Sequence, residues 1–172
     1  MISHGFDPIA SPDARVLILG SLPGECSLRR GEYYAQPQNA FWRLMGDLYG
    51  AGLDLAYADR ARRLQQCGVA VWDVCASARR EGSLDASIVT NTVAANEFAA
   101  FFTAHAQLRM IAFNGATAAK LYERLVHVRM PARIQALPRI RLPSTSPAHA
   151  ALRYVDKLEA WTRLLAYEEV LA

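Results

Sequence analysis

The sequence predicts a single-domain, three-layer α/β/α fold built on a central, mostly parallel four-stranded sheet. Short, continuously apolar runs are typical of parallel strands that are covered on both faces. Helical stretches alternate with these runs, which favours a doubly wound sheet. The length of 172 residues suits one core of ordinary size, so we expect residues 1–172 to form one domain.

The apolar runs predict the positions of the strands. The expected strands are Arg15–Gly20, Gly68–Val74, Met110–Gly115 and Ile134–Ile140 with Leu142. The fourth run is the least regular, because Pro138 interrupts it and cannot donate a backbone hydrogen bond.

Helices are expected between the strands and after the last one. Their ranges are Phe41–Tyr49, Tyr57–Gln66, Val93–His105, Ala116–Val126 and Ala148–Leu171. In the last range apolar residues recur every three or four positions, which predicts a long amphipathic helix with one stripe facing the core. That stripe consists of Leu152, Val155, Leu158, Trp161 and Leu165.

Composition limits the class of protein. The net charge is +3, and seventeen of the nineteen basic residues are arginine. This balance permits phosphate binding without requiring it, and the arginine content is equally well explained by genome composition. No run of about eighteen apolar residues is present, and the amino terminus lacks the pattern of a secretory signal. We expect a cytoplasmic protein with no membrane partner.

Three cysteines are present, with no C-x-x-C pair and no histidine at zinc-ligand spacing. We therefore expect no metal site. Cys67 and Cys75 are predicted to be small core residues, and Cys26 lies in a loop but is not expected to be a catalytic thiol.

Two polar segments follow expected strands. GSLPGECS covers Gly20–Ser27 and runs on to YYAQPQNAFW at Tyr33–Trp42, and LPSTSPAHA covers Leu142–Ala150. Open α/β sheets keep their binding sites outside the carboxyl ends of the strands, so we expect both segments to meet at that edge. The second segment has a simpler interpretation as the start of a helix.

Together these motifs resemble the uracil-DNA glycosylase superfamily, and most closely its hypoxanthine-DNA glycosylase branch. The G-S-x-P-G loop, the tyrosine pair, the asparagine of P-Q-N-A-F-W and S-T-S-P-A all match, so the resemblance covers nearly the whole chain. It implies a uracil-DNA-glycosylase-like fold and removal of a flipped, damaged base from DNA. It implies no cofactor, and three cysteines are too few for the four-cysteine iron–sulfur cluster of some relatives.

The resemblance implies that Asn39 is catalytic. Many relatives hold the attacking water with an acid or amide at the position that is Leu22 here, and leucine cannot orient water. Asn39 matches the asparagine of the hypoxanthine branch, and its amide could position water. Alternatively, Asn39 caps the helix expected near Phe41.

The base-binding residues implied by the resemblance lie in the first loop and at strand ends. The set is Gly20, Ser21, Leu22, Tyr34, Asp73 and Asn114. Tyr34 would stack on the base, and the carboxylate of Asp73 would accept from the N1–H of hypoxanthine. Alternatively, Tyr34 is a surface residue and Asp73 pairs with Arg79 or Arg80 or caps a turn. Helix-start geometry also explains Asn114, and the neighbouring Tyr33 faces either the core or DNA.

The remaining candidates are expected to contact DNA. They are Pro23, Gly24, Ser27, Ser144, Thr145, Ser146 and His149. His149 is placed at the start of the last helix, where it either contacts phosphate or faces solvent. Leu142 replaces a histidine that stabilises the base anion in several relatives, which fits a base other than uracil.

The sequence therefore predicts a monofunctional, monomeric DNA glycosylase that removes hypoxanthine by water attack, with uracil as a secondary substrate. One alternative keeps the fold but makes uracil the main substrate. Another is a lesion-binding module without catalysis, suggested by Leu22 and Leu142. A nucleotide-binding α/β protein is a weaker alternative, because neither phosphate-loop motif is present.

Overall fold

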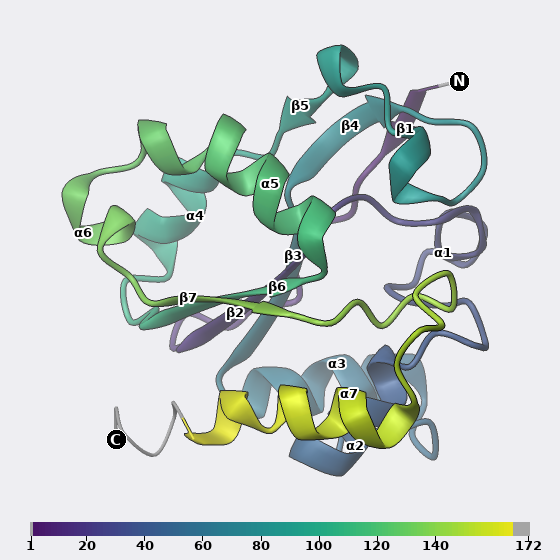
Figure 1. Cartoon of the computed structure of the whole chain (residues 1–172). Coiled ribbons are helices and arrows are strands. Elements are labelled where there is room, and N and C mark those ends of the chain that lie inside the picture. Colours follow the sequence, from purple (N-terminus) through teal and green to yellow (C-terminus); the bar gives the residue numbers. More distant parts are fainter. Residues whose placement is uncertain (1, 167–172) are drawn as a thin grey trace.

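The computed structural model describes residues 2–166 and forms a three-layer α/β/α arrangement. Four parallel strands make the central sheet in the order β3-β2-β6-β7. Helices α4, α5 and α6 cover one face, and α2, α3 and α7 cover the other (Figure 1). The predicted fold class and the parallel four-stranded sheet are confirmed.

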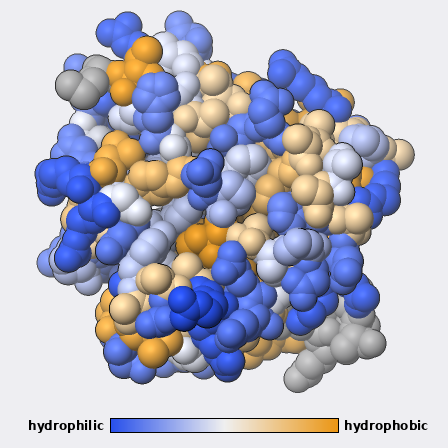
Figure 2. Space-filling view, turned by 180° about the vertical axis from the view of Figure 1, so that it is seen from behind, coloured by the Kyte–Doolittle hydropathy of each residue, from blue (hydrophilic) through white to orange (hydrophobic). Residues whose placement is uncertain are grey.

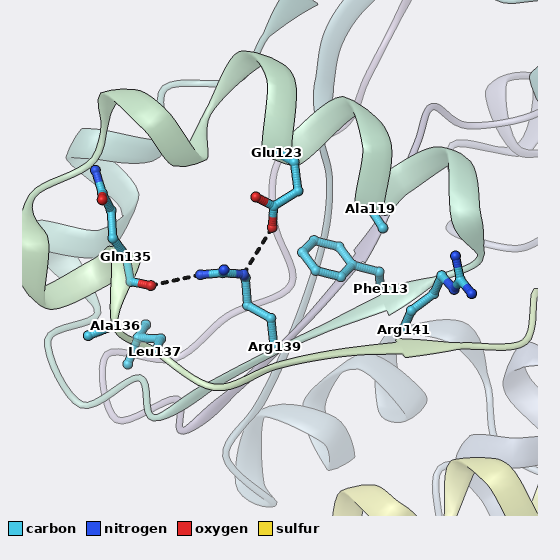
Figure 3. Close-up of a pocket in the computed structure, with 8 residues that line it drawn as sticks. All are labelled: Phe113, Ala119, Glu123, Gln135, Ala136, Leu137, Arg139 and Arg141. Carbon is cyan, nitrogen blue, oxygen red and sulfur yellow. Dashed lines mark hydrogen bonds and ion pairs between the residues drawn. The ribbon is translucent and has the colours of Figure 1, made fainter.

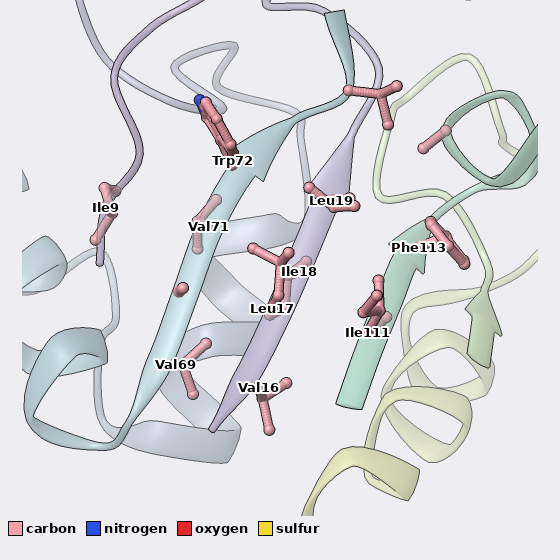
Figure 4. Packing of buried hydrophobic residues seen from close by; sticks show 14 of the residues in the cluster. Ile9, Val16, Leu17, Ile18, Leu19, Val69, Val71, Trp72, Ile111 and Phe113 are labelled. Carbon is pink, nitrogen blue, oxygen red and sulfur yellow. The ribbon is translucent and has the colours of Figure 1, made fainter. Parts of the chain in front are cut away.

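The central strands are β2 (Val16–Gly20), β3 (Val69–Asp73), β6 (Met110–Asn114) and β7 (Arg139–Leu142). Every residue of β2, β3 and β6 is buried, as their apolar runs predict. Figure 4 shows Val16–Leu19 of β2 packed between side chains of β3 and β6. Each large aliphatic side chain buried in this way stabilises the fold by about 1.5–3 kcal/mol.

The helices are α1 (Glu25–Arg30), α2 (Phe41–Tyr49), α3 (Tyr57–Gln66), α4 (Phe98–Ala104), α5 (Ala116–Leu125), α6 (Ala132–Gln135) and α7 (Tyr154–Trp161). The predicted bounds of α2 and α3 are correct. Helix α2 ends because Gly50 adopts a left-handed conformation with φ 69°, and its N–H donates to the carbonyl of Gly46.

A second, antiparallel sheet was not predicted. It contains β1 (Ile2–His4), β4 (Cys75–Arg79) and β5 (Ala94–Ala95). Short 3₁₀ turns η1 (Asp85–Ser87) and η2 (Thr90–Thr92) connect β4 to β5, and η3 (His127–Arg129) follows α5. Because β5 uses residues 94–95, the helix predicted over Val93–His105 is confirmed only from Phe98.

The strand predicted over Ile134–Ile140 is wrong in its first half. Ile134 lies in α6 and is buried, and the strand begins only at Arg139, directly after Pro138. The proline has no N–H for the sheet ladder, which explains why pairing starts after it.

The last helix begins at Tyr154, not at Ala148. Its amino terminus is capped by Arg153 and Asp156, and the Arg153 N–H donates to Asp156 Oδ2 at 3.2 Å. Leu152 and Val155 are exposed, so the buried stripe starts later and contains Trp161. The predicted residues beyond 166 lie outside the described part of the chain.

No described helix is long and apolar enough to cross a bilayer. Figure 2 shows the face opposite to that of Figure 1, where strongly apolar residues appear only in small separate groups among polar ones.

Candidate active site

A cavity of about 920 Å³ lies beyond the carboxyl ends of the central strands. The strands β2, β3, β6 and β7 end at Gly20, Asp73, Asn114 and Leu142, and all four residues line it. Both polar loops contribute to its wall, so the expectation that they meet at one sheet edge is confirmed.

All the site residues predicted from sequence line this one cavity. They are Gly20, Ser21, Leu22, Pro23, Gly24, Ser27, Tyr34, Asn39, Asp73, Asn114, Ser144, Thr145, Ser146 and His149. Their shared location at the sheet edge agrees with the prediction, but location alone does not test their roles. Cys26, from α1, also lines the cavity.

The first loop, Gly20–Ser27, is fixed by hydrogen bonds from Arg80, a buried residue that directly follows β4. Its guanidinium donates to the carbonyls of Leu22 and Pro23, and its Nε donates to that of Gly82. Ser21 Oγ donates to Asp85 Oδ1 at 2.6 Å. The loop is therefore fixed by side chains from the segment after β4.

Gly20 is required by close packing at the end of β2. A Cβ at this position would lie 2.3 Å from Asp73 Oδ1 and 2.8 Å from the hydroxyl of Tyr34. The missing side chain therefore lets two polar groups approach the same point at the floor of the cavity.

Asn39 accepts a backbone hydrogen bond and also lines the cavity. Its Oδ1 accepts from the N–H of Phe41 at 3.0 Å, so the structural alternative is borne out. Half-buried Asn39 still lines the cavity, and its Nδ2 has no hydrogen-bond partner among the described residues. The contact with Phe41 fixes the amide in one orientation.

Tyr34 has a left-handed backbone with φ 54° and is packed more tightly than a free loop residue. Its ring stacks on fully buried Phe41, with 3.9 Å between ring centroids and an interplanar angle of 22°. The alternative that Tyr34 is a surface residue is therefore wrong, because its ring packs against the core. Its neighbour Tyr33 is buried and donates to the carbonyls of Phe6 and Asp7, so Tyr33 belongs to the core.

Asn114 and Thr145 form a buried pair that joins the end of β6 to the late loop. Asn114 Nδ2 donates to Thr145 Oγ1, and the Thr145 N–H donates to Asn114 Oδ1, both at 2.9 Å. Thr145 is only 1% exposed, so its predicted contact with a DNA phosphate is wrong: that hydroxyl is inaccessible. Asn114 likewise acts first by positioning Thr145.

Ser27 is another corrected candidate. It is buried in α1, and its hydroxyl accepts from the N–H of Ala35 at 3.1 Å, so it holds the chain next to Tyr34 and is not placed to bind phosphate. Pro23 is buried as well, whereas Gly24 is partly accessible.

The rest of the late loop is accessible. Ser144 and Ser146 are half-buried, and each hydroxyl accepts a backbone N–H two residues further along the chain. His149 is exposed in the loop before α7, so its predicted position at the start of the helix is wrong. The serines cap turns of their own loop, and α7 begins well after them.

Asp73 is the most unusual residue of the cavity. It is 3% exposed, and its Oδ2 has no hydrogen-bond partner among the described residues. Burial, reinforced by the charge of Asp85 and opposed by that of Arg80, raises the pKa of this carboxyl to about 7. The described residues contain no ion pair between Asp73 and Arg79 or Arg80, so the predicted salt bridge is not formed.

Sequence reasoning missed Asp85, and it considered Arg80 only as an ion-pair partner of Asp73 and not as the residue that fixes the first loop. Asp85 lines the cavity from η1, and burial raises its pKa while the hydrogen bond from Ser21 lowers it. Neither residue belongs to a local motif. The only sequence signal was the excess of Gly, Ser and Asp in 81–87, which indicates a loop without showing what it covers.

A second, more open groove of about 670 Å³ lies between α5 and β7. Figure 3 shows Arg139 there, paired with Glu123 at 2.9 Å and donating to the carbonyl of Gln135. Its central charges are thus neutralised by protein groups. The groove contains no buried unpartnered polar atom among the described residues, which distinguishes it from the strand-end cavity. Nor do the described residues contain a cluster suited to a metal ion.

Comparisons with known proteins agree on one family. The sequence model of the Uracil DNA glycosylase superfamily matches residues 8–169. The hypoxanthine DNA glycosylase of Methanosarcina acetivorans is 39% identical over 127 residues, which cover 73% of this chain and 78% of that protein. Its counterpart in Methanosarcina barkeri is 36% identical over 116 residues, covering 67% and 72%.

A solved structure is similar over almost the whole chain. It is a solution NMR structure of a candidate uracil DNA glycosylase from Methanosarcina acetivorans, with a TM-score of 0.76 and 35% identity. The similarity covers 96% of this chain and 99% of the other.

Replacing Gly20 by alanine should destabilise the protein. The new Cβ would overlap Asp73 Oδ1, and overpacking of this kind lowers the free energy of unfolding by about 1–3 kcal/mol. Urea denaturation measures the change. Gly24→Ala is the matched control, because its Cβ would meet Ser83 atoms only at 3.4 Å or more. Equal stabilities for the two variants would contradict the crowding at Gly20.

Replacing Asp73 by asparagine should stabilise the protein more at high pH than at low pH. The folded carboxyl has a pKa of about 7 against an ordinary 3.8, so the folded state holds the proton more tightly and wild-type stability falls as pH rises through this interval. The amide variant does not share this loss. Its Tm should exceed that of wild type by several degrees at about pH 8, since 1 kcal/mol corresponds to about 2–4 °C.

Thermal unfolding followed by circular dichroism at several pH values measures this difference. The exposed Glu159→Gln change is the control for removing one carboxylate, and its Tm difference from wild type should vary little with pH. A Tm difference for Asp73→Asn that stays constant from about pH 4 to about pH 8 would contradict the raised pKa.

Proposed function

The chain belongs to the uracil DNA glycosylase superfamily, and on that premise we propose that it excises hypoxanthine from DNA and leaves an abasic site. It is a DNA N-glycosylase that acts on deaminated bases, with uracil as a secondary substrate. The names of the two Methanosarcina relatives support hypoxanthine as the main base. Water attack at the N-glycosidic bond is the proposed chemistry.

The observation that carries the proposal is the strand-end cavity with its unpartnered polar floor. Its volume of about 920 Å³ is in the range of small-molecule sites, and an extruded nucleotide is such a ligand. Asp73 Oδ2 is buried without a hydrogen-bond partner among the described residues. A buried polar atom is costly to leave unpaired, so this oxygen is suited to contact the edge of a base.

Asn39 is proposed to position the attacking water. Leu22 is buried in the cavity wall and offers no polar group. The amide of Asn39 is already oriented by its bond to the Phe41 N–H. A fixed amide can hold a water by its remaining donor and acceptor, and fixed geometry is itself a source of rate enhancement.

Tyr34 is proposed to stack on the extruded base. Phe41 covers one face of its ring, so only the other face can meet a base. The stack on Phe41 holds the ring in place before DNA binds, which reduces the entropy lost on stacking. Base–aromatic stacking contributes about 1–3 kcal/mol.

The rim of the cavity is proposed to contact the DNA backbone. Ser144, Ser146 and His149 are the accessible candidates of the late loop, and exposed Arg141 adds positive charge beside them. Phosphate contacts of this kind make binding depend on salt. We expect a monomer in the cytoplasm that needs no iron–sulfur cluster.

A panel of DNA oligonucleotides tests the function. Purified protein is incubated with duplexes that carry hypoxanthine, uracil, xanthine or ethenoadenine, and alkali then cleaves any abasic site. The proposal expects strand cleavage after alkali, fastest for hypoxanthine. Faster release of uracil would favour the uracil-specific alternative, and tight lesion binding without release would favour a lesion-binding module.

The same samples treated with borohydride should give no covalent protein–DNA adduct. Strand nicking requires an amine that forms a Schiff base with the sugar. Lys120 and Lys157 are the only lysines, and neither lines the cavity. A trapped band would contradict the water-only mechanism.

Asn39→Ala and Asn39→Asp should each lower the single-turnover rate of base excision by about 100-fold, because both disturb the water, while lesion binding persists. The two variants separate the roles of the residue. Aspartate keeps an oxygen that can accept from the Phe41 N–H, whereas alanine removes it. The exposed neighbour Gln38→Ala is the control. A near-normal rate in Asn39→Ala would contradict the catalytic assignment and leave the side chain only its bond to the Phe41 N–H.

A further inference from the structure

Two carboxylates from different parts of the chain line the same cavity. Asp73 lies at the end of β3, and Asp85 lies in η1 on the far side of the first loop. Asp85 Oδ1 accepts from Ser21 Oγ at 2.6 Å. Burial raises the pKa of Asp85, whereas this hydrogen bond and the charge of Arg80 lower it and favour the ionised form. Asp73 Oδ2 is fully enclosed and has no partner in the described chain. The two carboxyl groups therefore line one cavity but differ in their hydrogen bonding.

We propose, on the basis of the proposed base excision, that Asp73 acts as a neutral acid that donates to the leaving base, and that Asp85 is the positioning residue that keeps Asp73 in this form. Asp85 touches Ser21 and acts on Asp73 through its charge. The pair resembles other enzyme sites where two carboxyl groups are given opposite roles by their surroundings.

The groups around Asp73 favour the neutral acid. Burial contributes most to its raised pKa, and the negative charge of Asp85 adds to it. Arg80 provides the opposing positive charge, but its guanidinium donates to backbone carbonyls of residues 22, 23 and 82 and not to Asp73. The other titratable groups facing Asp73 are Tyr33, Tyr34 and Cys75, whose pKa values are raised first by burial and then by its charge.

Asp73 provides a donor at the strand ends, where Leu142 offers none. Leu142 is 1% exposed and has no proton to give to a departing base. When the C1′–N9 bond breaks, its electron pair passes to the base and spreads onto the acceptor atoms of the purine edge. A donor aimed at this edge stabilises that charge in the transition state.

The proton balance of the step is complete. Water oxygen bonds to C1′ and releases one proton to solvent, while Asp73 transfers its proton to the base and later regains one from solvent. The products are a neutral base and an abasic sugar. Ionised Asp73 could accept from the N1–H of hypoxanthine but could not donate a proton in this step, because a carboxylate only accepts hydrogen bonds.

The test is the pH dependence of single-turnover excision from a hypoxanthine-containing duplex. The wild-type rate should fall as pH rises above about 7, where Asp73 loses its proton. Asp85→Asn removes the neighbouring charge but keeps an oxygen that can accept from Ser21. Its descending limb should move to lower pH by roughly 1 unit, with a loss of about 5- to 10-fold near pH 8 and little change near pH 5.5.

Three further variants separate charge from structure. Asp85→Glu keeps the charge and should keep the limb near its wild-type position. Glu81→Gln removes an exposed carboxylate from the same segment and should leave the profile unchanged. Asp73→Asn cannot titrate, so its rate should be low and flat across this range. An unshifted limb in folded Asp85→Asn, or a persisting limb in Asp73→Asn, would overturn the proposal.

Carbon-13 NMR titration of the aspartate carboxyls tests the pair without relying on activity. The Asp73 carboxyl of the wild-type protein should titrate near pH 7, and at lower pH in Asp85→Asn. Titration below about pH 5 in the wild type would overturn the inference even if every variant were unstable. A protein that releases no base at any pH but shows the expected titration would instead refute the proposed function.

Discussion

The site depends on the paired hydrogen bonds between Asn114 and Thr145. Both bonds are buried and measure 2.9 Å, and they tie the end of β6 to the late loop. The carbonyl of Thr145 in turn accepts from the N–H of Ala40 at 3.0 Å, which brings in the segment with Asn39. One threonine therefore links two loops that are about a hundred residues apart in sequence. Trp161 reinforces this link, because its Nε1 donates to the carbonyl of Pro143 in the late loop and its ring packs against the ring of Phe41.

The burial of Asp73 lowers the stability of the fold. Placing Asp73 at the end of an apolar strand buries a carboxyl group that has no partner for one oxygen among the described residues. Such groups persist only where the surrounding structure fixes them, and here Gly20 leaves the space and Arg80 secures the loop above it. The buried carboxyl group of Asp73 thus lowers the stability of the fold around the cavity, as polar groups at functional sites commonly do.

A feature of this structure could be predicted from the sequence where neighbouring residues determine it, and could not where it depends on contacts between distant segments. The bounds of α2 and α3 could be predicted because apolar periodicity and helix ends are local signals, and the cavity residues could be located because they follow buried strands. The contacts of Arg80 and Asp85 could not, because they join the segment after β4 to a loop about sixty residues earlier. The same limit explains Thr145: a hydroxyl in a polar loop reads as exposed until its partner Asn114 is known.

Leu22 and Leu142 are buried in the cavity wall, and the polarity of that wall affects the protonation of Asp73. Leu22 stands where many relatives carry a polar water-binding residue, and Leu142 where several carry a histidine, so both departures make the cavity wall more apolar. A less polar wall disfavours ionised carboxyl groups, which promotes the neutral form of Asp73. The apolar side chains of Leu22 and Leu142 thus belong to the surroundings in which the buried acid is proposed to donate to a base.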